Sequence, residues 1–169
     1  TLALAAILTA SGVAFWQAGQ ARKAAADMAQ VNEFLHDVLR QSNPYSAGGE
    51  ISLSEAVDLA QDQVAKRFAG RPELSSGVRF ALGYSMLSRN QLQPAREQLE
   101  LALAESLQSV GPQAAQTFEI REALAQLLIS SDRPTEAEQP LKQLIADIEA
   151  AGLQAKPIYL LSLNNLGQL

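Results

Sequence analysis

Apolar residues return every three or four positions along most of the chain, which is the spacing of a helix with one buried side. Pro and Gly interrupt this pattern at Asn43-Pro44, at Gly48-Gly49 and at Gly70-Arg71-Pro72. Ala, Leu and Gln dominate over Val, Ile, Thr and aromatic residues, a balance that favours helix over strand. The sequence therefore predicts an all-α protein. We expect a helical stalk at residues 22–40, a linker at 41–51, a capping helix at 52–71 and helical repeats at 72–169.

The first stretch differs from the rest, because Leu2 to Trp16 carries no charge. At about 1.5 Å per residue it covers roughly 24 Å, about one turn short of the roughly 30 Å of bilayer hydrocarbon. Phe15 and Trp16 stand where the interfacial aromatic residues of a membrane helix belong. We predict a truncated transmembrane helix over residues 1–21, whose missing turn would precede Thr1. The alternatives are a cleaved signal peptide and a buried globular helix.

From Glu73 onward the chain repeats itself at a 42-residue step. The corresponding positions are Leu82-Gly83, Leu124-Ala125 and Leu166-Gly167 in one helix, Ala95 and Ala137 in the next, and Asn90 and Asp132 in the turn between them. Small residues at these places allow the two helices of a hairpin to cross closely, while the leucines fill the space between successive hairpins. The sequence thus predicts a solenoid with two complete hairpins and a third begun.

The repeat unit resembles a known family. Leu82-Gly83 followed by Ala95, Leu99 and Ala102 resembles the tetratricopeptide repeat signature. The 42-residue step and the phrase Leu163-Asn164-Asn165-Leu166-Gly167 are similar to the longer variant found in kinesin light chains and in many bacterial signalling proteins. The resemblance covers residues 73–169, and it implies a right-handed α-solenoid with further repeats after Leu169.

The same resemblance implies where a partner binds, because the first helices of such repeats line a concave surface. The implied groove residues are Phe80, Tyr84 and Leu87 in the first repeat, Glu122, Gln126 and Ile129 in the second, and Leu161, Asn164 and Gln168 in the third. Asn and Gln side chains can hydrogen-bond a peptide backbone, and Phe80 with Tyr84 offers an apolar anchor. We therefore expect a peptide or protein partner. The alternative is that Phe80 and Tyr84 pack against the helix at 52–69.

The order of segments resembles a whole-protein architecture. A membrane helix, a stalk ending in residues 31–39, an Asn43-Pro44 linker and then repeats are similar to the region after the kinase domain of bacterial membrane-bound serine/threonine kinases. They are also similar to the region after the winged-helix domain of acid-sensing regulators. This implies a sensor or scaffold module of a single-pass protein of the bacterial inner membrane, with its repeats in the periplasm rather than the cytoplasm. The alternative is a stalk that dimerises through Phe34 and Val38.

Composition and charge limit the chemistry. The 169 residues carry a net charge of −5 and no Cys, which argues against nucleic-acid binding by this segment and excludes disulfides and thiolate metal sites. His36 is the single histidine, and we interpret it as a surface residue beside Asp37, with pH sensing as the alternative. We find no catalytic set, metal site or phosphate-binding loop in the sequence, and we expect no cofactor. Any enzymatic role would have to come from residues before Thr1.

Overall fold

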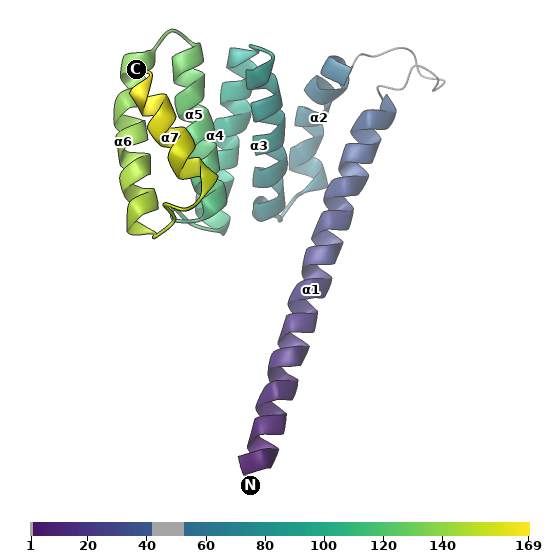
Figure 1. Ribbon diagram of the computed structural model, residues 1–169. Coiled ribbons are helices and arrows are strands. Elements are labelled where there is room, and N and C mark those ends of the chain that lie inside the picture. The colour runs from purple at the N-terminus through teal and green to yellow at the C-terminus, as the bar shows by residue number, and fades with distance from the viewer. Residues whose placement is uncertain (1, 42–52) are drawn as a thin grey trace. The chain divides into compact units, whose positions relative to one another are not determined.

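The computed structural model describes residues 2–41 and 53–169, and all its regular elements there are α-helices, as predicted (Figure 1). The helices are α1 (Leu2–Gln41), α2 (Leu53–Arg67), α3 (Pro72–Ser88), α4 (Leu92–Ser109), α5 (Ala115–Ser130), α6 (Pro134–Ala150) and α7 (Pro157–Gly167). The chain divides into two compact units, Thr1–Ala56 and Val57–Leu169. Apart from Gln41, the linker predicted for 41–51 lies outside the described residues.

Helix α1 runs for 40 residues without interruption. Within the part of the chain that the structure describes, no helix combines the length and the apolar character needed to cross a membrane. A spanning helix needs about 20 mainly apolar residues, whereas the uncharged stretch of α1 gives way after Trp16 to Gln17, Gln20 and Arg22. The transmembrane helix predicted for residues 1–21 is therefore wrong, and so is the single-pass inner-membrane location with periplasmic repeats that was inferred from it.

The second unit is built from helical hairpins. α3 pairs with α4, and α5 pairs with α6 (Figure 1). α5 also contacts α3 on one side and α7 on the other, so these three helices form one layer, which we call the first-helix layer. α4 packs against α3 and α5, and α6 packs against α5 and α7. Each second helix thus covers the junction between two members of the first-helix layer.

The turns within the two hairpins have the same geometry. Asn90 and Asp132, 42 residues apart, both have a positive φ, of 60° and 56°. Asn and Asp tolerate this left-handed conformation better than other residues with a side chain. The amide of Asn90 donates to the carbonyl of Leu87 at 2.9 Å, and the amide of Asp132 donates to the carbonyl of Ile129 at 3.2 Å. The 42-residue step of the sequence therefore recurs in the backbone.

Each hairpin is also tied by an arginine and a carboxylate at equivalent positions. Arg79 Nε on α3 donates to Glu105 Oε1 on α4 at 3.1 Å. Arg121 Nη1 on α5 donates to Asp147 Oδ2 on α6 at 2.7 Å. Both members of the second pair lie 42 residues after their counterparts in the first. The repeat therefore extends to polar contacts between helices.

α3 and α4 cross closely at Gly83. A β-carbon added there would lie 2.8 Å from Leu99 Cγ and 3.3 Å from the carbonyl oxygen of Ala95, and both of these residues are fully buried. In the second hairpin the equivalent residues Ala125 and Ala137 belong to one buried cluster. The predicted crossing of small residues is confirmed in both hairpins.

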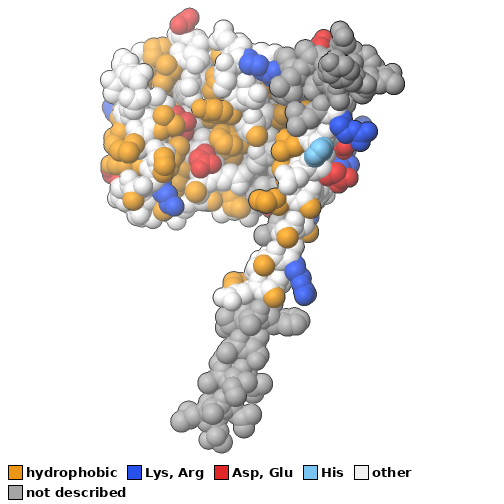
Figure 2. Space-filling view, turned by 45° about the vertical axis from the view of Figure 1, so that its right-hand side comes forward, with side chains coloured by type: hydrophobic (Ala, Val, Ile, Leu, Met, Phe, Trp, Pro, Cys, Tyr) orange, Lys and Arg blue, Asp and Glu red, His pale blue; other side chains and the backbone are white. Residues whose placement is uncertain are grey.

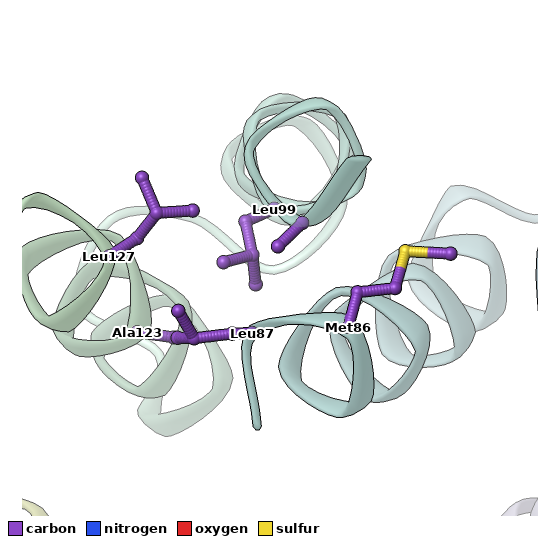
Figure 3. Packing of buried hydrophobic residues seen from close by; sticks show 6 residues of the cluster. Met86, Leu87, Leu99, Ala123 and Leu127 are labelled. Carbon is purple, nitrogen blue, oxygen red and sulfur yellow. The ribbon is translucent and has the colours of Figure 1, made fainter. Parts of the chain in front are cut away.

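A buried cluster around Leu99 links the first hairpin to the second. Leu99 of α4 lies above the junction of α3 and α5 (Figure 3). The same buried cluster contains Met86 and Leu87 from α3 and Ala123 and Leu127 from α5 (Figure 3). Because this buried cluster draws on both hairpins, neither hairpin completes its core alone.

The crossing at Gly83 gives a testable prediction. Gly83→Ala is expected to lower the free energy of unfolding by about 1 kcal/mol, because overpacking against Leu99 costs about 1–3 kcal/mol and the better helix propensity of Ala returns about 1 kcal/mol. Urea denaturation measures the change.

Gly77→Ala on the same helix is the matched control. An added β-carbon there would meet only Gln116 Nε2 at 3.5 Å, an ordinary contact distance. This variant is expected to gain about 0.5–1 kcal/mol from helix propensity. Equal effects of the two substitutions would contradict a tight crossing at Gly83.

Candidate partner-binding site

An open pocket lies between α5 and α7. Its volume is about 580 Å³, and its lining residues are Glu119 of α5 and Pro157, Ile158, Leu160, Leu161 and Asn164 of α7. Pro157, Leu161 and Asn164 are three or four residues apart, so they lie along one side of α7. Leu161, on this side, is 41% exposed. The pocket therefore combines an apolar wall with one carboxylate and one amide.

The other side of α7 is fixed to the hairpins. Ile158 and Tyr159 pack against a buried cluster formed by Phe118, Leu144 and Ile148. The Tyr159 hydroxyl donates to Glu149 Oε1 at 2.6 Å, and this hydrogen bond raises the pKa of the phenol. Since one side of α7 is packed in this way, the open side is presented in a fixed orientation.

Two aromatic residues of α3 form a second part of the predicted groove. The ring centroids of Phe80 and Tyr84 are 6.0 Å apart, and the rings are tilted by 48°. Phe80 is half-buried and packs against the buried cluster of α3, α4 and α5. Tyr84 is 43% exposed. Part of the Tyr84 side chain therefore lies at the surface, while packing of the two rings on the helix at 52–69 stays an untested alternative.

Leu87 and Glu122, also predicted to line the groove, are buried. Leu87 belongs to the cluster around Leu99. Glu122 is 2% exposed, and its Oε1 accepts a hydrogen bond from Asn165 Nδ2 at 2.5 Å. Burial raises the pKa of the Glu122 carboxyl to about 7, although the hydrogen bond from Asn165 lowers it in part. The side chains of Leu87 and Glu122 therefore do not line the open surface.

The remaining predicted residues lie at different depths. Gln126 and Ile129 are half-buried, and Ile129 packs against the cluster of Ala125 and Ala137. Asn164 and Gln168 are exposed, and Asn164 lies in the pocket beside Leu161. The structure thus groups Leu161 with Asn164, and Phe80 with Tyr84.

The sequence-based prediction missed several pocket residues. They are Glu119, Pro157, Ile158 and Leu160. Glu119 could have been found from the repeat, since it lies 42 residues before Leu161 and three residues before Glu122. The role of Asn165 as the hydrogen-bond donor to Glu122 has no local signal, because the two residues are 43 apart in the chain.

The charge of Glu119 is not neutralised within the described residues, since no side chain there forms a hydrogen bond or ion pair with it. The charged residues of two other hollows are paired. One hollow, of about 560 Å³, contains Arg121, which binds Asp147 at 2.7 Å. The other, of about 350 Å³, contains Lys142 and Glu138, which bind each other at 2.6 Å. The pocket between α5 and α7 therefore differs in holding an unpaired carboxylate.

The surface in Figure 2 shows hydrophobic side chains spread over the helical array, with acidic side chains between them. Among the described residues there is no group of His, Asp and Glu that could hold a metal ion. The arrangement is suited to contact with apolar and polar groups of a ligand.

No family model, no curated protein and no solved structure matches this chain. The resemblances to tetratricopeptide repeats and to bacterial kinases or regulators therefore stay predictions, as does dimerisation through Phe34 and Val38.

Proposed function

We propose that this chain is a protein-interaction module, a sensor or scaffold, which binds a peptide or protein segment on the first-helix layer with the pocket between α5 and α7 as its main contact. The observation that carries this proposal is the pocket itself, where Leu161 is exposed beside Asn164 and the unpaired Glu119. The 42-residue recurrence of turns and ion pairs supports the accompanying interpretation that the array is of the tetratricopeptide type.

Each group in the pocket has a physical use in binding. Complete burial of a leucine side chain contributes about 1.5–3 kcal/mol, so Leu161 provides the main gain on contact with an apolar ligand group. The amide of Asn164 can donate to and accept from a peptide backbone. Because α7 is already ordered by its packed side, little conformational entropy is lost on its part when the ligand binds.

A display library of random dodecapeptides, selected on the full chain, tests the proposal. Leu161→Asp is expected to weaken binding of the enriched peptides by about tenfold or more, because it puts a charge where an apolar side chain of the ligand is buried. Fluorescence anisotropy measures the affinities, and NMR amide shifts show whether the peptide contacts α5 and α7.

Leu101→Asp is the matched control, since Leu101 is an exposed leucine on α4, outside the first-helix layer. It is expected to bind the same peptides as the unmodified chain does. Equal losses in the two variants, or shifts confined to α4 and α6, would reject the pocket as the binding site.

A further inference from the structure

We propose that the pocket between α5 and α7 selects a segment in which an aliphatic side chain packs on Leu161 and a neighbouring Lys or Arg pairs with Glu119. This inference rests on the proposed function and names the chemical class of the ligand.

The first reason is the charge of the lining. Glu119 is the one charged residue among the lining residues, and the rest are apolar apart from Asn164. A carboxylate beside an apolar wall is complementary to a segment in which a positively charged side chain stands next to an aliphatic one. The net charge of −5 adds a longer-range attraction for a basic segment.

The second reason is that no nearby group of the chain satisfies Glu119. Lys156 precedes the lining residue Pro157 and is exposed, yet within the described residues it forms no ion pair with Glu119. The Glu119 side chain is exposed, so its carboxylate is accessible to a ligand.

The expected size of the effect is moderate, because the pocket is open to solvent. Exposed ion pairs contribute about 0.2–1 kcal/mol, so a Lys-flanked peptide is expected to bind up to about fivefold more tightly than the same peptide flanked by Gln. Salt is expected to reduce this preference, since exposed charges are screened.

The test compares three selections from the same dodecapeptide library, on the unmodified full chain, on Glu119→Lys and on Glu97→Lys. Glu97 is exposed on α4, so its replacement changes the net charge by the same amount at a distant place. We expect Lys and Arg to be enriched beside the aliphatic position with the unmodified chain and with Glu97→Lys. With Glu119→Lys we expect Asp and Glu there instead.

The possible outcomes separate this inference from the proposed function. If apolar peptides bind at α7 without a preference for charge, the inference is overturned and the proposed function stands. The same holds if the preference for basic residues persists with Glu119→Lys. A shift of preference with Glu97→Lys as large as that with Glu119→Lys would also overturn it, because the effect would then come from net charge. If no peptide is enriched above background, both proposals fail.

Discussion

Replacing Arg79 by methionine is expected to lower the free energy of unfolding by about 3 kcal/mol. Arg79 is only 6% exposed, and it donates to Glu105 at 3.1 Å and to Gln98 Oε1 at 2.9 Å. Methionine fills a similar volume but leaves a partly buried carboxylate and a buried amide oxygen without their donor. Glu105 Oε2 already has no hydrogen-bond partner within the described residues, so the carboxylate cannot rely on a second contact.

Arg121→Met is the control at the equivalent position of the second hairpin. The side chains of Arg121 and Asp147 are 23% and 34% exposed, and Asp147 also accepts from Gln143 at 2.9 Å. Because solvent and Gln143 remain available to Asp147, the expected loss is about 1 kcal/mol or less.

Urea denaturation measures both losses. The slope of the unfolding free energy against urea concentration should be the same in the variants as in the unmodified chain. Combining Arg79→Met with Glu105→Leu is expected to recover much of the stability, since the unpaired charge is then gone. Similar losses for the two arginine variants would show that burial does not distinguish the pairs.

The second large effect is a pH dependence due to Glu122. Its pKa is about 7 in the folded protein and 4.5 ordinarily, because burial disfavours the charged form. Below pH 4.5 the carboxyl is protonated in both states. As the pH rises toward 7, the unfolded chain loses this proton first, so unfolding becomes more favourable by up to about 3 kcal/mol.

Glu122→Gln is expected to remove this loss, because its amide can still accept from Asn165 and does not ionise. The variant should therefore be more stable than the unmodified chain above pH 7, with little change at pH 5. Urea unfolding at several pH values, together with a carbon-13 titration of the carboxyl, checks both expectations.

Asp147 does not obscure this measurement. The hydrogen bond from Arg121 lowers the pKa of its carboxyl below 3.8, so its contribution to stability is lost only as the pH falls below about 4. That window lies on the acid side of the Glu122 transition and has the opposite sign. A stability profile that stays flat between pH 5 and 8 would contradict the buried position of Glu122.

The sequence by itself determined the hairpins and the positions where their helices cross. Gly83 and Ala95 reveal a close crossing because a helix interface tolerates only small side chains at that distance. Asn90 and Asp132 mark the turns, since few residues accept a positive φ. These constraints are local or recur at a fixed step, so a single sequence is enough to show them.

Only the tertiary structure decided which groove positions stay open. Glu122 has the repeat position of Phe80, yet its carboxylate is buried against Asn165, which comes from another helix. Helical periodicity gives the side of the helix on which a residue lies, but its burial depends on groups distant in sequence. The membrane helix was mispredicted for a related reason, because lack of charge over a short stretch does not supply the apolar length that a bilayer requires.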